Sequence, residues 1–459
     1  MTGLHAGLEA QIDAWRGYVL RRQAISAADV EELEDHLREQ VTDLQATGLD
    51  DEEAFLVAIK RLGNLDTVSR EYAREHSDRL WKQLSLVPDE SAGSGAPAWR
   101  ELAVVLLFAV GAGVAVKVGV SVLDGDAALL RNVGLLVLPF LAGYFAWKRR
   151  LTLRVGAILL AAFAALAVAL NVYPFATGGT EAFANEIGMT EGLAALHAPA
   201  VLWVLVGLAY VGGSWQSHAR RMDFARFTGE LVVYLALLAL GGGVLIGLTF
   251  AIFELVGVDF ELVMEQWIMP FAPAGALVVA AWLVEAKQNV VENIAPVLTK
   301  VFTPLTILML LAFLGVLAAG GGLDDVDRGL LILTDAVLLL VMGLLLYAVS
   351  ARDSLAPPGF FDRLQLVLVG AAIAVDVVML TAMVTRIAEF GSSPNKIAAL
   401  GLNLLLLVHL ARSAWLTVGF LRGQRPFAAL ERWQTQYLPL YGAWAAVVVV
   451  AFPPLFGFV

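Results

Sequence analysis

Five polar residues stand inside long apolar stretches of this sequence. Lys117, Asp335 and Asp376 are ionisable, and Asn403 and His409 share one apolar segment. An ionisable side chain at membrane depth costs roughly 2.5 to 3.5 kcal/mol on insertion scales, so it needs a partner or a water-filled cavity. We therefore expect Lys117 to pair with Asp335 or Asp376, either as a structural ion pair between helices or as part of a transport or sensing site.

His409 has two interpretations. Histidine titrates near neutral pH and can relay protons. A single histidine in a membrane helix also forms hydrogen bonds between helices, which would be a purely structural role. Asn403 and Arg412 lie on the same expected helix, and both interpretations remain open.

These residues must be positioned by about eleven apolar segments, each of roughly the twenty residues needed to cross a hydrocarbon core of about 30 Å. The chain is 59% hydrophobic and only 16% charged. We expect spans at 101–122, 129–147, 153–174, 197–215, 229–255, 267–285, 301–320, 329–350, 364–386, 396–419 and 437–457. The predicted fold is all-α, a polytopic helical bundle over residues 99–459 that contacts the lipid bilayer.

Several of these helices carry residues that kink or interrupt a helix. Gly241 to Gly243, Pro270, Pro273 and Pro304 fall inside expected spans. Broken membrane helices expose backbone groups that protein or water must cover, and transporters use them to build substrate sites. The two halves show no inverted repeat, however, which weakens a transporter interpretation.

Lys and Arg are unevenly distributed between the two alternating sets of loops. One set holds Lys148, Arg149, Arg150, Arg154, Arg220, Arg221, Arg226, Lys287, Lys300, Arg352, Arg363, Arg412, Arg422, Arg425 and Arg432. The other set holds only Arg131, Arg328, Arg386 and Lys396. Cytoplasmic loops carry the excess of basic residues. The sequence thus predicts a cytoplasmic N-terminus and, with an odd number of spans, an extracytoplasmic C-terminus.

Residues 1–84 have a different pattern, that of a small cytoplasmic helical domain. Apolar residues recur at helical spacing, which indicates four amphipathic helices at 4–22, 27–46, 51–62 and 66–84. No basic start followed by an apolar run marks a cleavable secretion signal. Residues 85–98 are rich in Gly, Ser, Pro and Ala, as expected of a flexible linker.

Three motifs occur in order in this head: EELEDHLRE at 31–39, GLDDEEA at 48–54 and AIKRLGN at 58–64. Together they resemble the permease prefix domain, a HAAS-type helical signalling domain found beside PadR-type regulators and ahead of permease-like membrane regions. The resemblance covers roughly residues 4 to 75. It implies a regulatory or protein-binding module without chemistry of its own, and a cytoplasmic protein partner in the context of a PadR-type regulator.

A second resemblance concerns the membrane region. The segments AKQNVVENIAP at 286–296, FTPL at 302–305 and PNKIAALGLN at 394–403 resemble uncharacterised multi-pass bacterial proteins of the DUF4153 type. This resemblance implies no known activity.

The acidic run of the head is a candidate regulatory surface. It comprises Glu31, Glu32, Asp35, His36 and Glu39. Glu32 and His36 lie four residues apart on one helix face, but a zinc site needs three or four converging ligands and no second histidine lies nearby. We interpret the run as a solvated face or as a docking face for a basic partner, and predict no metal site.

Other chemistries are disfavoured by composition. The chain has no cysteine, which excludes disulfides and thiol nucleophiles. Its net charge of -11 disfavours nucleic acid as a partner, since phosphate binding needs clustered Lys and Arg. No zinc-protease, serine-hydrolase, P-loop or dinucleotide motif is present. We predict no catalytic residues and no cofactor, and the chain is not expected to be an enzyme.

The sequence therefore predicts a protein of the bacterial plasma membrane in which a cytoplasmic regulatory head is coupled to a polytopic membrane domain. It would act in signalling or in regulated transport. Two alternatives remain open: an intramembrane enzyme acting on lipid, which would need polar residues that converge near one leaflet, and a membrane scaffold without transport activity.

Overall fold

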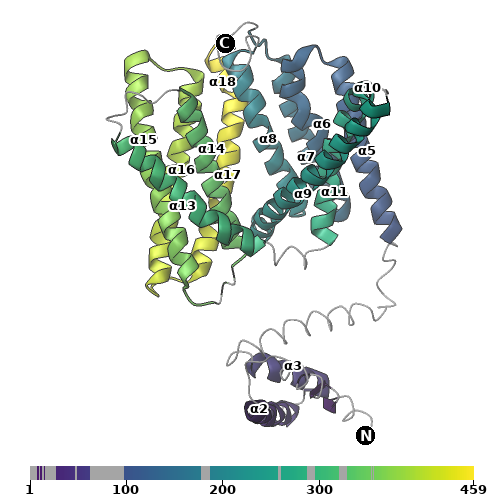
Figure 1. Cartoon of the computed structure of the whole chain (residues 1–459), viewed down its shortest axis with the longest axis vertical. Helices are drawn as coiled ribbons and strands as arrows, with labels where there is room; N and C mark the ends of the chain where they lie inside the picture. Colours follow the sequence, from purple (N-terminus) through teal and green to yellow (C-terminus); the bar gives the residue numbers. More distant parts are fainter. Residues whose placement is uncertain are drawn as a thin grey trace. The chain divides into compact units, whose positions relative to one another are not determined.

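The chain folds as two compact units, residues 1–96 and 97–459. The computed structural model describes residues 8, 9, 11, 12, 15, 27–46, 49–62, 98–176, 187–256, 260–286, 295–319, 328–352, 354 and 356–459. Helices are the regular elements of this described part, which contains no β-strand (Figure 1). The all-α prediction is confirmed.

The first unit contains helices α2, Ala27–Ala46, and α3, Asp51–Leu62. Both begin and end where the sequence predicts, and the other two predicted head helices fall mostly or wholly outside the described residues. Leu37 and Val41, spaced by one helical turn, are buried against Phe55 and Ile59. Asp50 Oδ1 accepts a hydrogen bond from the backbone N–H of Glu53 at 2.8 Å, which caps the start of α3.

The second unit is a membrane bundle. Its helices are α5 Ala98–Val122, α6 Gly125–Lys148, α7 Leu153–Val172, α8 Met189–Tyr210, α9 His218–Val256, α10 Glu261–Val263, η2 Met264–Ile268, α11 Met269–Ala286, α13 Ala295–Ala319, α14 Arg328–Ser350, α15 Phe360–Phe390, α16 Pro394–Leu421, α17 Phe427–Val450 and α18 Phe452–Leu455. Among the described residues, ten helices are long and apolar enough to cross a bilayer. The chain is therefore an integral, multi-pass membrane protein.

The expected eleventh span, residues 437–457, is not one of these ten. Helix α17 carries Glu431, Arg432 and Gln434 in its first half, and these residues lower its hydropathy. The helix nevertheless runs the length of the bundle. Near its start Thr435 lies 3.3 Å from His218 at the start of α9, while Val459 accepts a hydrogen bond at 2.6 Å from the Thr190 N–H at the start of α8.

Helices α6, α8, α14 and α16 all finish on the same side of the membrane unit, and we call this side the basic end. We call the opposite side the far end. The unit has two halves, α5–α8 with α11 and α13–α17, each with its own hydrophobic core (Figure 1). Helix α9 runs obliquely across the bundle. Its 39 residues extend about 58 Å, so it must tilt to fit a hydrocarbon core of about 30 Å.

The expected helix breaks are mostly absent. Helix α9 is continuous through Gly241 to Gly243, and α13 is continuous through Pro304. The exception lies just before Pro270, where Met264–Ile268 forms a π-helical turn. A π-turn is a local change in helix winding, and Pro270 and Pro273 after it lack the N–H groups that would bond to the preceding turn.

Close packing between α16 and α17 generates a first prediction. A Cβ atom on Gly401 would lie 1.9 Å from the Trp444 ring, whereas a Cβ on Gly343 of α14 would meet nothing within 4 Å. We expect Gly401→Ala to lower the free energy of unfolding by about 1 to 3 kcal/mol through overpacking. Gly343→Ala, the matched control, should be neutral or slightly stabilising because alanine favours helix. Thermal unfolding in detergent measures both, and equal melting temperatures for the two variants would contradict this packing.

Candidate functional site

Lys117 does not pair with either aspartate, so the predicted ion pair is wrong. Its ammonium donates to the Gln266 carbonyl at 3.1 Å and lies 3.3 Å from the centre of the Trp267 ring. The reason is topological, because α5 packs against α11, which is continuous with the π-turn that holds both partners. A carbonyl dipole and an aromatic face stabilise the ammonium here.

The other four membrane candidates, Asp335, Asp376, Asn403 and His409, lie together in the α14–α17 half of the bundle. Asn403 of α16 is fully buried and donates to Asp335 Oδ1 of α14 at 2.8 Å. Its amide also donates to the Ala399 carbonyl, one turn earlier, at 3.0 Å. The amide is thereby oriented toward α14, and the hydrogen bond partly satisfies a carboxyl at membrane depth.

Asp376 of α15 is the most unusual of these residues. Its side chain is 0% exposed, and neither carboxyl oxygen has a hydrogen-bond partner in the part of the chain that the structure describes. Asp335 is close enough for the two carboxyl groups to interact electrostatically. Two adjacent carboxylates in a low-dielectric interior repel each other and lose their hydration. In the part of the bundle that the structure describes, neither aspartate forms an ion pair with a basic side chain, so both carboxyl groups can be ionised only at a high cost in free energy.

His409 lies further along α16, between Asn403 and the basic end, and aromatic side chains of α17 enclose its ring. Its ring centre is 4.6 Å from that of Tyr437, 5.7 Å from Trp433 and 5.8 Å from Tyr441. His409 Nδ1 and the Tyr441 hydroxyl share a hydrogen bond of 3.0 Å. Of the two interpretations, the structure shows the bond between helices, and a proton relay through the same atoms stays a prediction.

The polar groups of this half form a series along the bundle axis, which we call the polar series. It starts at Asn403 and Asp335 and continues through Asp376 to Tyr441, which is within electrostatic range of Asp376. From Tyr441 it reaches His409. The Gln434 amide lies beside the histidine ring and donates to Ser413 Oγ at 2.9 Å.

Sequence reasoning missed three members of this series. Tyr441, Gln434 and Ser413 are neutral, so a search for ionisable groups in apolar segments passes over them. One signal was available: Gln434, Tyr437 and Tyr441 recur at spacings of three and four residues, which places them on one face of a helix.

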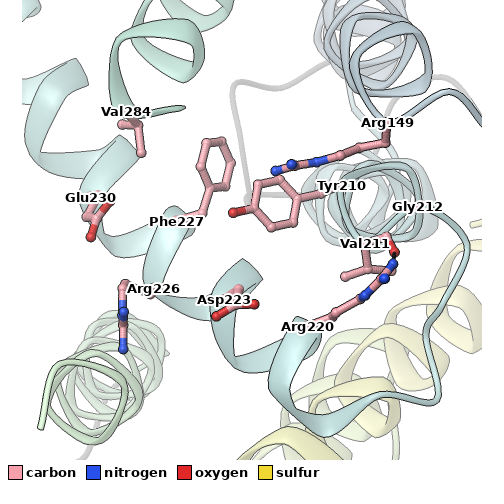
Figure 2. A pocket seen from close by; sticks show the side chains of 10 residues that line it. All are labelled: Arg149, Tyr210, Val211, Gly212, Arg220, Asp223, Arg226, Phe227, Glu230 and Val284. Atoms are coloured by element: carbon pink, nitrogen blue, oxygen red, sulfur yellow. Dashed lines mark hydrogen bonds between the residues drawn. The ribbon is translucent and has the colours of Figure 1, made fainter. Parts of the chain in front are cut away.

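A second polar feature is a cavity of about 600 Å³ at the basic end, between the ends of α6, α8 and α11 and the start of α9. It is lined by Arg149, Tyr210, Val211, Gly212, Arg220, Asp223, Arg226, Phe227, Glu230 and Val284. Figure 2 shows the side chains of Arg149, Tyr210, Asp223 and Phe227 directed toward a common space. Because side chains of both charge signs line the cavity, it suits a small charged or zwitterionic solute.

The walls of this cavity are fixed by ion pairs and carbonyl contacts. Arg149 Nη2 donates to both carboxylate oxygens of the buried Glu285, at 2.9 and 3.0 Å. Arg220 donates to the Val211 carbonyl at 2.9 Å. Arg226 of α9 donates to the Ser350 carbonyl at the end of α14, which ties the cavity wall to the half that holds the polar series. From the sequence, these arginines served only to predict which loops are cytoplasmic.

The predicted regulatory surface of the head lies on α2. The side chains of Glu31 and Glu32 lie outside the described residues, whereas those of Asp35, His36 and Glu39 are exposed. His36 Nδ1 is 3.8 Å from Glu39 Oε2. Throughout the described residues, no group of three or more His, Cys, Asp or Glu side chains is arranged to hold a metal ion.

Comparisons with known proteins return nothing: no family model, no curated protein and no solved structure matches this chain. The resemblances of the head and of the membrane region therefore stay predictions.

The contacts of Asp335 generate a second prediction. Asn403→Ala removes the amide donor and leaves a carboxyl unsatisfied, which costs about 1 to 3 kcal/mol, and this loss should shrink when Asp335→Ala is also present. Lys117→Met serves as the control, because its effect should add to that of Asp335→Ala. Thermal unfolding of single and double variants in detergent measures both cycles. Additivity in the Asn403 cycle, or coupling in the Lys117 cycle, would contradict the arrangement.

Proposed function

We propose that this chain is a regulated, proton-coupled transporter of a small charged solute in the bacterial plasma membrane. In this proposal the polar series carries the proton, the basic-end cavity receives the solute, and the N-terminal head controls the activity. The observation that carries the proposal is Asp376, a fully buried carboxyl at membrane depth without a hydrogen-bond partner among the described residues.

A buried carboxyl of this kind is neutral or compensated, because the cost of an isolated charge in low dielectric is several kcal/mol. A bound proton supplies the neutralisation with the least demand on ligands. A metal cation would need more oxygen ligands than the two carboxyl groups provide. The groups that follow Asp376 in the polar series, a tyrosine hydroxyl and a histidine ring, also exchange protons.

The basic-end cavity supports a transport role over a purely structural one. Its lining offers guanidinium donors, carboxylate acceptors and the hydroxyl of Tyr210, so both ends of a dipolar solute find complementary groups. Arg226 joins its wall to α14, the helix that carries Asp335. A change in charge at the polar series can therefore affect the cavity through α14 and its hydrogen bond with Arg226.

The orientation of the protein is part of the proposal. The basic end carries Arg149, Arg220, Arg352 and Arg425, and the positive-inside rule assigns such an end to the cytoplasm. Helix α5 starts at this end, since Glu101 pairs there with Lys148 at 3.0 Å. The N-terminal head is then cytoplasmic and the C-terminus extracytoplasmic.

For the head we retain the permease-prefix interpretation as a proposal. The side chains of α2 that are described as exposed include Asp35, His36 and Glu39. An acidic helix face fits a basic cytoplasmic partner, and the resemblance suggests a PadR-type regulator. Binding of that partner would set the activity of the membrane unit.

The third prediction tests proton coupling directly. In proteoliposomes with an imposed pH gradient and external amino acids, phosphate esters or organic cations, the wild type should admit protons faster than protein-free vesicles with at least one solute class. Asp376→Asn should reduce this flux to background, because it removes the proton-binding carboxyl while keeping its shape. A pH-sensitive dye inside the vesicles reports the rate.

The matched control is Asp124→Asn, which neutralises an exposed carboxyl at the start of α6 that makes no side-chain cap. It should retain the wild-type flux. Wild-type flux in Asp376→Asn, or background flux in the wild type with every solute class, would refute the proposal.

A further inference from the structure

Two arginines at the basic end share one tryptophan. The guanidinium carbon of Arg425, in the loop after α16, lies 3.9 Å from the ring centre of Trp415, and that of Arg412 lies 4.3 Å from the same ring. Arg412 also lies 5.8 Å from the ring centre of Trp433. The indole of Trp415 thus brings two positive charges together, which repel each other unless an anion lies between or beside them.

Stacking satisfies the faces of these guanidinium groups but not their edges. A guanidinium has five N–H donors in its plane. Among the described residues, the side chains of Arg412 and Arg425 make neither a hydrogen bond nor an ion pair. Other arginines of this end differ: Arg149 pairs with Glu285, and Arg352 with Asp362. A pair of stacked guanidinium forks with free edges suits a phosphate group.

The nearest acidic side chain in the sequence, Glu431, is directed elsewhere. It is half-buried and interacts with Arg226 and Arg352, which belong to the interior of the basic end. It therefore does not neutralise the positive charges of Arg412 and Arg425 beside Trp415. Arg422 and Arg432 are exposed nearby in the sequence and add to the local positive charge.

The outer face of α16 indicates that the anion is carried by a lipid. Leu404, Val408, Arg412 and Trp415 recur at spacings of four, four and three residues, so they form one stripe along the helix. All four are exposed: the exposed fractions are 48% for Leu404, 53% for Val408 and 46% for Trp415, and Arg412 is exposed as well. The opposite face of this helix is the buried one that carries Asn403 and His409. The exposed stripe is apolar at membrane depth and cationic near the basic end.

Arg412 itself needs an anion at this position. It lies nine residues before Leu421, the last residue of the span, which is about 13 Å along the helix axis. Its long side chain can reach toward the interface, and Trp415, one turn closer to the end of the helix, is of a residue type enriched at interfaces.

We propose that Arg412, Trp415 and Arg425 form a binding site for the phosphate group of an anionic phospholipid in the leaflet at the basic end. One acyl chain of the lipid lies along Leu404 and Val408. The two guanidinium groups hold the phosphate from adjacent sides of the indole. None of Arg412, Trp415 and Arg425 belongs to the polar series or to the lining of the basic-end cavity.

The test uses the full-length chain, delipidated in detergent and then exposed to phosphatidylglycerol or phosphatidylcholine, with retained lipid counted by native mass spectrometry. The wild type should retain phosphatidylglycerol in preference to phosphatidylcholine. The double variant Arg412→Gln/Arg425→Gln should bind phosphatidylglycerol at least about tenfold more weakly, because two basic contacts to an anionic headgroup are lost. Arg412→Lys/Arg425→Lys keeps the charges but not the planar forks, and should lose only part of the affinity.

The matched control is Arg154→Gln/Arg363→Gln, which removes the same charge from two exposed arginines that stack on no ring among the described residues. It should bind phosphatidylglycerol within about twofold of wild type, because neither guanidinium belongs to the proposed lipid site. Equal binding by Arg412→Gln/Arg425→Gln and the control, or no preference of the wild type for phosphatidylglycerol, would overturn the proposal. Complete displacement of the lipid by millimolar inorganic phosphate would also overturn it, since the ligand would then be a soluble anion.

Discussion

The constraint on which this structure depends is the cost of charge in a medium without water. Most ionisable side chains of the membrane unit lie at its two ends, where they are paired or exposed. Arg131 and Glu191 form a largely buried pair at the far end, and at the basic end the exposed Arg149 pairs with Glu285, whose side chain is buried. Such pairs satisfy each other within the protein. Asp376 departs from this pattern, because its carboxyl is buried and unbonded in the described bundle, and this departure is the strongest indication of function.

In the proposed function, proton binding, lipid binding and solute binding involve residues of the same helices. The inner face of α16 holds Asn403 and His409 in the polar series, while its outer face presents Arg412 to the bilayer. The basic-end cavity lies beside the other half of the unit, joined to α14 through the bond from Arg226 to the Ser350 carbonyl. In this proposal, α14 and α16 connect proton binding, lipid contact and the shape of the cavity. Packed helices shift as units rather than deform.

Much of the fold follows from local patterns in the sequence. Apolar residues at helical spacing sufficed to place α2 and α3, and apolar length sufficed to place ten spans. Pairing between helices did not follow, because it depends on contacts between distant segments that hydropathy does not encode. Lys117 was therefore assigned to the wrong partner, although Asp376 and Asn403, two of the polar residues singled out from the sequence, are fully buried in the bundle. Neutral residues of the polar series, such as Tyr441, could not be identified by a search for ionisable groups. The structure identifies Tyr441 by its contact with His409.

The central claim is that Asp376 holds a proton inside the membrane unit. Isotope-edited infrared difference spectroscopy reads this state directly, since a protonated carboxyl and a carboxylate have separate stretching bands. With labelled aspartate, at neutral pH and in buffer without alkali cations, the account predicts a protonated-carboxyl band in the wild type that disappears in Asp376→Asn. A spectrum of the wild type with carboxylate bands alone, unchanged by that substitution, would contradict it.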